Sequence, residues 1–208
     1  VYPYNASSTV ISASRVQKSK KVLITWSVPH PEHAGRELSE IAADMGCSLE
    51  DAAEKLKPGG AIYFAMDEED VQRVIKFPHS MVASDGLPND EHPHPRLWGT
   101  FPRVLGHYSR DLGLITLEDA VHRMTGLPAT VFGLTGRSVL APGNKADIVV
   151  FDPDTICDKA DFEHPTRPAE GVDAVFVNGQ AIVRNGAATG ARPGKALRRQ
   201  EMAKEAAG

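Results

Sequence analysis

The 208-residue sequence predicts an α/β fold in two parts, and three observations lead to this prediction. Between residues 20 and 80, short apolar runs alternate with stretches of helical spacing, a pattern typical of strands and helices packed in layers. The apolar run 80–84 then ends on Asp85 and Gly86, as a buried strand would. After Gly136 the apolar period shortens to that of strands, with turn residues between the runs. We therefore expect a parallel α/β layer followed by a compact β module.

Strands and helices alternate through the first third of the chain. Apolar runs predict strands and amphipathic stretches predict helices: strands 21–27 and 61–66, and helices 34–46, 48–56 and 67–77. Gly46 is a typical helix stop, because glycine readily adopts the left-handed conformation at a C-terminus. Ser48 and Asp51 have the spacing of an N-terminal cap, in which the serine oxygen accepts a backbone hydrogen bond. We therefore expect two separate helices joined by a tight turn.

Helical spacing returns after a loop rich in proline and histidine. Three further helices are predicted, over 100–113, 116–126 and 127–134. Thr116 and Asp119 repeat the capping arrangement, so the second of these helices should begin at a defined residue.

The last third of the chain has the pattern of strands. Two β-runs are predicted, at 138–154 and 172–186. Asn178-Gly179 divides the second run and predicts a hairpin, because a type I′ turn needs positive φ at both positions. The tail, residues 194–208, is charged and predicts a frayed helix.

Composition narrows the class of protein. The chain is 41% hydrophobic and 24% charged, as ordinary globular proteins are. Its net charge of -4 is too small to indicate a nucleic-acid or membrane partner, and no apolar run approaches the roughly 18 residues of a membrane span. Cys47 and Cys157 are too far apart to predict a disulfide framework. We expect a cytoplasmic protein with free thiols, and its oligomeric state stays open.

The carboxyl end of the run 80–84 is the first candidate for a catalytic group. Asp85 stands there before Gly86, although such a pair also forms ordinary turns. In parallel barrels, catalytic groups lie at the carboxyl ends of strands, where a carboxylate can bind a metal or take a proton from metal-bound water. Residues 1–136 are too few for a complete barrel of about 250 residues. Because the chain begins on Val1 within an extended segment, we expect a fragment of a longer enzyme.

His92 and His94 form an H-x-H pair, which would suit a metal site. Each histidine precedes a proline and so favours extended backbone, where alternate side chains can share a face. Only Asp90 and Glu91 lie close enough in sequence to add a ligand, whereas zinc sites use three or four. Chelation stays open, but a structural role in the loop is favoured.

Other polar residues have two interpretations each. Arg96 could bind a carboxylate through two parallel hydrogen bonds, or it could be an ordinary surface arginine. The hydroxyls of segment 2–8 could cap a turn or donate at the mouth of a strand: Tyr2, Tyr4, Ser7 and Ser8. Three histidines that stand apart in sequence are interpreted as structural: His30, His33 and His79.

Several segments resemble a known family. GLPATVFGLTGRSVLAPGNKADIVVFDPD (126–154) resembles the C-terminal signature of the metal-dependent amidohydrolase superfamily. Three more segments narrow the resemblance to D-aminoacylases, the N-acyl-D-amino-acid deacylases: YPYNASST, PHPEHAGRELSEIAADMG and SDGLPNDEHPHPRLWGTFPRVLGHY. The similarity covers residues 1 to about 195.

This resemblance implies a particular α/β architecture. It would be the C-terminal part of a TIM-like (β/α)8 barrel with an inserted excursion, followed by strands of a small β-sandwich. The implied parts are barrel segments 1–6 and 67–136, an insertion 7–66 near the active-site mouth, sandwich strands 137–190 and a charged tail 191–208.

The resemblance also implies an activity, the zinc-dependent hydrolysis of N-acyl-D-amino acids to a D-amino acid and a carboxylate. Asp85 matches the catalytic aspartate, which would take a proton from zinc-bound water and pass it to the leaving amine. The residues implied to hold the substrate's α-carboxylate are Tyr2, Ser8 and Arg96, and those implied to line its side-chain pocket are Tyr63 and Met66. A methionine in that pocket would suit a hydrophobic D-amino acid.

The zinc ligands of this family do not match residues of the chain. They are a first-strand H-x-H pair, a cysteine and later histidines, all before the YPY segment, so we expect no metal ligand here and an inactive isolated chain. The expected partner is a small-molecule N-acyl-D-amino acid. Two alternatives stay open: a non-catalytic fragment or subunit of a split amidohydrolase, and a sibling deacylase specific for N-acyl-D-glutamate or N-acyl-D-aspartate.

Overall fold

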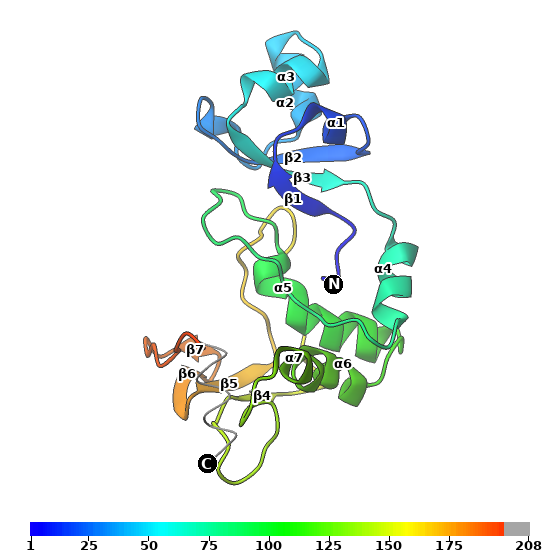
Figure 1. Cartoon of the computed structure of the whole chain (residues 1–208). Helices are drawn as coiled ribbons and strands as arrows, with labels where there is room; N and C mark the ends of the chain where they lie inside the picture. Colours follow the sequence, from blue (N-terminus) through cyan, green and yellow to red (C-terminus); the bar gives the residue numbers. More distant parts are fainter. Residues whose placement is uncertain (198–208) are drawn as a thin grey trace.

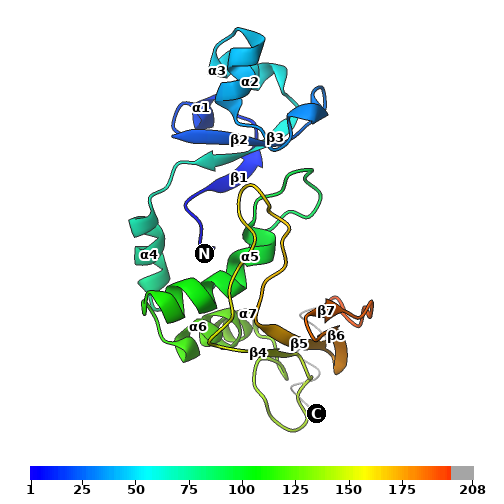
Figure 2. The same ribbon diagram turned by 180° about the vertical axis from the view of Figure 1, so that it is seen from behind.

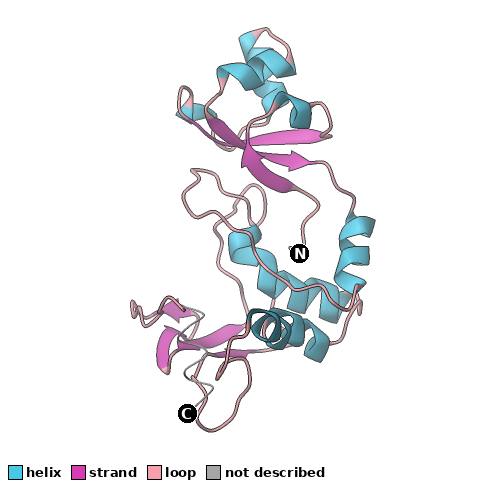
Figure 3. Cartoon of the chain, in the orientation of Figure 1, coloured by secondary structure: helices cyan, strands magenta, loops and turns pink. Residues whose placement is uncertain are grey.

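The computed structural model describes residues 1–197, which form two sheets with a helical layer between them (Figure 1). A three-stranded sheet lies at one end, helices lie in the middle and a four-stranded sheet lies at the other end (Figure 3). Within this described part, no helix is long and apolar enough to cross a membrane.

The first sheet is antiparallel. Its strands are β1 (Ser7–Val10), β2 (Lys21–Ser27) and β3 (Gly59–Phe64), in the order β1-β3-β2. Strands are therefore confirmed at 21–27 and close to 61–66, but the expected parallel layer is wrong for this sheet. The connection from β2 to β3 begins and ends at the same end of the sheet, where Ser27 pairs with Gly59. Strand β3 is therefore antiparallel to β2.

Helices cover one face of this sheet (Figure 1). They are α1 (Ala13–Val16), α2 (Leu38–Met45) and α3 (Leu49–Lys55). Side chains of a strand alternate between faces, so Ile24 and Tyr63 pack toward the helices. Leu23 and Ile62 pack on the opposite face, against Phe162. Both faces of the first sheet are therefore covered.

The predicted helix ends are confirmed. Ser48 Oγ accepts a hydrogen bond from the Asp51 amide at 3.1 Å, and Thr116 Oγ1 accepts one from the Asp119 amide at 3.2 Å. Gly46 ends α2 in the left-handed conformation, with φ of 60°. These caps depend on residues three or four apart, so the sequence determines them locally.

The first of the predicted helices starts later than expected, at Leu38 instead of residue 34. The Gly35 amide donates to the Ile24 carbonyl at 2.7 Å, and this pairing holds the preceding residues in an extended conformation beside β2. Pairing with a neighbouring strand therefore overrides the helical spacing.

The helical layer includes the two helices that are joined by the loop carrying Asp85. Its elements are α4 (Glu68–Lys76), α5 (Arg96–Arg103), a π-helical continuation (Val104–Asp111), α6 (Leu117–Met124) and α7 (Gly126–Phe132). The helix predicted at 100–113 begins earlier, at Arg96, directly after Pro95. Proline fixes φ at a value suitable for a helix start, which explains the earlier boundary.

The strand predicted at 80–86 does not form. The Val82 amide donates to the Arg123 carbonyl at 3.1 Å, and the Ala83 amide donates to the Val1 carbonyl at 2.9 Å. The segment is therefore extended but bonded to single residues on either side, without a ladder, and the prediction of a strand is wrong for the structure described.

The second sheet is also antiparallel. Its strands are β4 (Ile148–Phe151), β5 (Val172–Val177), β6 (Gln180–Arg184) and β7 (Ala187–Ala188), in sequence order. Asn178 and Gly179 have φ of 47° and 79°, which confirms the predicted hairpin. Residues 194–197 are not helical, and the rest of the predicted terminal helix lies outside the described residues.

The connection between β4 and β5 joins the two ends of the molecule. It runs from the second sheet past α5 to the first sheet (Figure 2). Phe162 in this connection contacts the ring of Phe64, with ring centres 4.7 Å apart. Asp158 accepts a 3.2 Å ion pair from Arg103 of α5. The connection thereby fixes the position of the first sheet relative to the helical layer.

Candidate active site

Asp85 lies on the loop between α4 and α5. Its φ of 49° places it in the left-handed region, which aspartate tolerates better than most residues. The next residue must be glycine, because a Cβ on Gly86 would come within 2.5 Å of the side chain of Leu97. Gly86 thus lets the backbone of the loop pack directly against Leu97 of α5. The Asp85 carboxylate is 69% exposed, and its Oδ2 lies 3.0 Å from Arg96 Nη2.

Arg96 is the first residue of α5, and its side chain is only 2% exposed. Its guanidinium carbon lies 4.6 Å from the centre of the Tyr2 ring. Within the described residues, Arg96 Nε has no hydrogen-bond partner. A buried guanidinium with an unused donor favours the binding of an anion, because burying an incompletely paired charge is costly.

His94 fixes the backbone at this arginine. Its Nδ1 accepts a hydrogen bond from the Arg96 amide at 3.0 Å, so its Nε2 donates to the Ala6 carbonyl, also at 3.0 Å. Burial, with the nearby Arg96 charge, lowers the pKa of His94 to about 3. His94 is therefore neutral and restricted to one tautomer, and both of its nitrogens are occupied.

His92 has a similar structural role. Its Nε2 lies 2.7 Å from the Phe162 carbonyl, and its amide donates to the Thr25 carbonyl at 2.9 Å. The two histidines of the H-x-H pair thus bind separate backbone carbonyls. These hydrogen bonds hold the loop against the first sheet.

Tyr2 and Ser8 lie on the side of the molecule that faces this loop. Tyr2 is adjacent to Arg96 through the ring contact described above. Ser8 is opposite Ile62 in the β1–β3 pairing and so shares the sheet face that is turned away from α2 and α3. Both residues therefore lie on the side of the first sheet that is turned toward Arg96.

Met66 and Tyr63 have different positions. Met66 lines a mostly apolar hollow of approximately 460 Å³ together with Tyr2, Val71 and Val74. Tyr63 is 1% exposed in the core beneath the helices, and its hydroxyl donates to the Val10 carbonyl at 3.1 Å. The structure brings Met66 close to Tyr2, but it directs Tyr63 to the opposite face of the sheet from Asp85.

The pair formed by Asp85 and Arg96 combines two chemical capacities. An exposed carboxylate can accept and return a proton, and a buried arginine can hold an anion in a fixed orientation. Comparison with known proteins identifies the family to which a chain with this pair belongs. A family model described as "Amidohydrolase family" matches residues 43–183.

The chain belongs to the amidohydrolase family.

Individual relatives are more specific. The chain is 56% identical over 198 residues to the D-aminoacylase of Alcaligenes xylosoxydans xylosoxydans, which covers 95% of the chain and 41% of that protein. It is 54% identical over 199 residues to the N-acyl-D-glutamate deacylase of the same organism, covering 96% of the chain and 41% of the relative. The resemblance to D-aminoacylases is therefore confirmed, and the chain spans about two fifths of the length of these relatives.

A solved structure of this amidohydrolase group has the same fold. It is the N-acyl-D-glutamate deacylase of Bordetella bronchiseptica, complexed with zinc and a phosphonate inhibitor that mimics the tetrahedral intermediate of its reaction. The TM-score is 0.86 at 54% identity, over 88% of this chain and 38% of that protein. Mixed helix and sheet in this arrangement is therefore characteristic of a part of these amidohydrolases.

The residues around Asp85 do not form a metal site by themselves. Among the described residues, the group of potential metal ligands that converges within 4.8 Å is His30, Glu32 and His33, and it does not include Asp85. At Asp85 the chain supplies one carboxylate, whereas zinc takes at least three protein ligands.

Sequence reasoning misses two features near the site. Arg103 donates through Nε to the Pro3 carbonyl at 3.0 Å and so fixes the segment that carries Tyr2. No local pattern indicates a contact between residues 100 positions apart. The sequence interpretation treats His30 and His33 as isolated, but the structure brings them together at Glu32, and H-P-E-H is the signal in the sequence that could have indicated it.

Proposed function

We propose that this chain is the C-terminal part of an amidohydrolase that hydrolyses the amide bond of N-acyl-D-amino acids. The observation that carries the proposal is the 3.0 Å pair between exposed Asp85 and buried Arg96, with Tyr2 against the guanidinium. The identity to D-aminoacylase and to N-acyl-D-glutamate deacylase supports the reaction class.

The spacing of this pair suits an α-amino acid derivative. In such a substrate, one carbon separates the amide nitrogen from the α-carboxylate. A proton carrier for the nitrogen and an anion site for the carboxylate must therefore be neighbours. Asp85 and Arg96 satisfy this condition, because their polar atoms are 3.0 Å apart.

Each residue then has a defined role. Arg96 binds the α-carboxylate, which replaces Asp85 as the partner of the guanidinium. Asp85, released from that ion pair, accepts a proton from the attacking water and transfers it to the amide nitrogen as the C–N bond breaks. Tyr2 and Ser8 lie on the same side and complete the carboxylate site through their hydroxyls.

Zinc is the cofactor that the relatives suggest, because the related deacylase structure contains it. When bound, zinc would lower the pKa of a water molecule and polarise the amide carbonyl. We propose that its ligands come from the region of the relatives that this chain does not span. The same region would complete a TIM-like barrel around segments 1–6 and 67–136, with 7–66 as the insertion, 137–190 as the β-sandwich part and 191–208 as a tail.

Met66 supports a hydrophobic substrate side chain. It lines the hollow beside Tyr2 together with Val71 and Val74, and burial of an apolar side chain against such a surface is favourable. Tyr63 contributes to this pocket only through the position of β3, since its own ring lies in the opposite core. Relative rates on N-acetyl-D-methionine and N-acetyl-D-glutamate would distinguish this assignment from the acidic-substrate alternative.

The Asp85→Asn substitution tests the proposal directly. Asparagine tolerates the same backbone conformation, so the loop should be retained while proton transfer is lost. In a polypeptide that joins this chain to the preceding region of the D-aminoacylase relative, we expect turnover to fall roughly a hundred- to ten-thousand-fold. Zinc content, measured by atomic absorption, should not change.

The matched control is Asp161→Asn, an aspartate outside the site whose side chain is 54% exposed. That variant should keep normal turnover. Near-normal activity in Asp85→Asn would contradict the assignment of the catalytic residue.

A second candidate follows from the coverage of about two fifths. The chain could be one component of a split amidohydrolase. Mixing it with a separately produced N-terminal part should then restore activity and show a complex by size-exclusion chromatography. Failure of the mixture, with activity in the joined polypeptide, would favour a single chain.

A further inference from the structure

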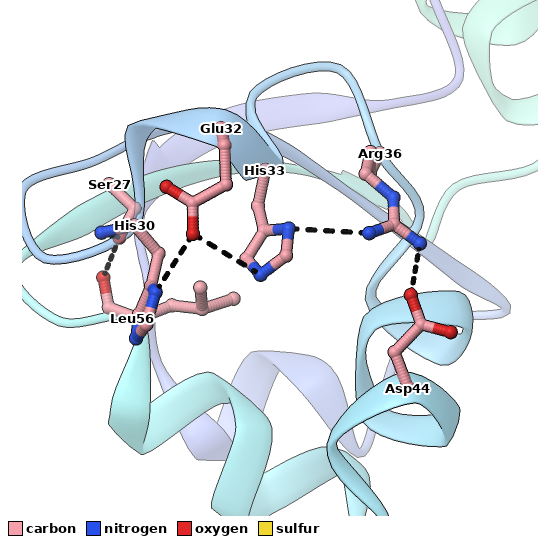
Figure 4. Close-up of polar contacts among 7 residues, drawn as sticks. All are labelled: Ser27, His30, Glu32, His33, Arg36, Asp44 and Leu56. Atoms are coloured by element: carbon pink, nitrogen blue, oxygen red, sulfur yellow. Dashed lines mark hydrogen bonds and ion pairs between the residues drawn. The ribbon is translucent and has the colours of Figure 1, made fainter.

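A cluster of two histidines and one glutamate lies on the turn after β2, in the part of the chain we assign to the insertion. The 3-10 turn Pro31–His33 brings the three side chains to one side (Figure 4). Glu32 Oε1 lies 3.1 Å from His30 Nδ1 and 3.9 Å from His33 Nε2. All three potential ligand atoms lie within 4.8 Å of one another.

We propose that His30, Glu32 and His33 bind a divalent transition-metal ion of the zinc class, at a site separate from the Asp85–Arg96 pair. A tetrahedral ion with bonds of about 2.0 to 2.2 Å holds its ligands about 3.3 Å apart. The separation of 3.1 Å between Glu32 Oε1 and His30 Nδ1 is already close to that value, and all three ligand atoms lie within 4.8 Å of one another. Two imidazoles with a carboxylate suit zinc or copper better than calcium or magnesium, which prefer oxygen ligands.

The backbone of the turn is held in place before any ion binds. The His30 amide donates to Ser27 Oγ at 3.2 Å, and that hydroxyl donates to the Leu56 carbonyl at 2.8 Å. The His33 amide donates to the His30 carbonyl at 3.1 Å. Ser27 is itself buried on β2, so the ligands extend from an anchored turn and not from a free loop. Less ordering is therefore needed when the ion binds.

The three proposed ligands differ in their exposure to solvent, and this difference indicates from which side an ion would reach them. The His33 side chain is 13% exposed, that of His30 is 36% exposed and that of Glu32 is 61% exposed. The ion would thus enter from solvent at Glu32 and contact His33 at the base of the site.

The positive charge of Arg36 would oppose the binding of a cation at His33. Its Nη1 lies 3.4 Å from His33 Nδ1, an arrangement that places the ring proton on Nε2, facing Glu32. Binding through Nε2 requires that proton to move to Nδ1, and Arg36 must then turn away. Asp44 can hold the displaced guanidinium, because it already lies 2.6 Å from Arg36 Nη2. Arg36 therefore weakens the site without blocking it.

The site is also adjacent to the loop between Asp85 and Arg96. A Cβ on Gly35, at the end of the turn, would lie 2.9 Å from His92 Nδ1. An ion bound at the turn would therefore limit the motion of the backbone against which the His92 ring packs. This coupling concerns the stability of the loop and does not depend on the proposed hydrolase activity.

The test is a calorimetric titration of the 208-residue chain with ZnCl2 in a non-coordinating buffer. We expect saturable binding that His30→Ala, Glu32→Gln and His33→Ala each weaken at least tenfold, since even partners that only orient a metal ligand contribute that much. The His30 and His33 ring signals in nuclear magnetic resonance spectra should shift on zinc addition. The control is His164→Ala, which removes a histidine that pairs with Asp161 at 3.5 Å and lies outside the cluster.

Arg36→Gln provides an independent test that leaves every ligand intact. It should tighten zinc binding several-fold, because the opposing charge is removed. Equal affinities in the parent chain and the three ligand variants, or weaker binding in Arg36→Gln, would overturn the proposal and leave the cluster as a set of ion pairs.

Discussion

The two sheets of this protein differ in how completely they are covered. In the first sheet, Ile24 and Ile62 point to opposite faces and are both fully buried, because helices cover one face and the β4–β5 connection covers the other. In the second sheet, Val149 and Val150 are 56% and 45% exposed. The first sheet thus has a complete core within the described residues, whereas the second presents apolar surface to solvent.

This difference indicates where the stability of the chain resides. Burial of apolar surface is the main favourable contribution to folding, so side chains of the first sheet should determine the free energy of unfolding. Exposed valines of the second sheet should contribute to an interface if the region present in the longer relatives covers them. Four predictions test this difference between the sheets, from the largest expected change in stability to the smallest.

The largest effect should come from a core substitution in the first sheet. Ile24→Ala should lower the free energy of unfolding by about 2 to 5 kcal/mol, because it leaves a cavity in a fully buried position. Val150→Ala should change it by less than about 0.5 kcal/mol in the same chain. Urea denaturation followed by circular dichroism measures both. Equal losses would show that the second sheet is as well packed as the first.

A pH-dependent effect should follow from His94, which links the first sheet to α5. Its folded pKa of about 3 is below the unfolded value of 6.5, so the unfolded chain binds an additional proton as the pH falls below 6.5. The stabilising contribution is therefore present above that pH and is lost toward pH 3. Stability at pH 5 should be roughly 2 kcal/mol lower than at pH 7.

His94→Gln identifies the group responsible for that slope. Glutamine can still donate to the Ala6 carbonyl, but it does not titrate. The pH dependence between 5 and 7 should become shallower in this variant, whereas His164→Ala, at an exposed position, should leave it unchanged. A slope that survives in His94→Gln would mean that other groups control it.

A smaller effect should distinguish the two sheets as separate units. Gly46 and Gly179 have φ of 60° and 79°, and at both positions an added Cβ would meet no neighbouring atom within 4 Å. Alanine at either position should therefore cost about 1 kcal/mol through backbone strain alone. Hydrogen exchange should show lower protection around β3 for Gly46→Ala and around β5 for Gly179→Ala. Loss of protection in both sheets from either change would show that they unfold together.

The smallest effect should come from a helix cap. Ser48→Ala removes the hydrogen bond to the Asp51 amide and should cost about 1 kcal/mol or slightly less, at an exposed position. Thermal denaturation measures this change. Ser48→Asp should restore most of the stability, since aspartate also caps helices well.

Features determined within a few residues were predictable from the sequence. The caps at Ser48 and Thr116 and the hairpin at Asn178 depend on side chains and backbone angles next to them. For His92 and His94 the neighbouring prolines favoured a role within the loop, and in the structure each side chain is hydrogen-bonded to a backbone carbonyl.

Features that depend on distant partners were not predictable. The direction of β3 depends on where its connection ends, and the conformation of 80–86 depends on contacts with Val1 and Arg123. The same limit applies to the site. Asp85 and Arg96 could be proposed, but the stacking of Arg96 on Tyr2 joins segments that only the folded chain brings together.

The contact between Arg103 and the Pro3 carbonyl has a consequence for the order of folding during synthesis. The two residues are 100 positions apart, and Asp158, which holds the same arginine, is 55 positions further on. At about 5 to 20 residues per second, the ribosome needs roughly 5 to 20 seconds to extend the chain from the carbonyl to the arginine. The first sheet has all its strands by Phe64 and can pair earlier. The segment with Tyr2 must therefore wait, so the side of the molecule that carries Tyr2 and Arg96 is assembled after the first sheet.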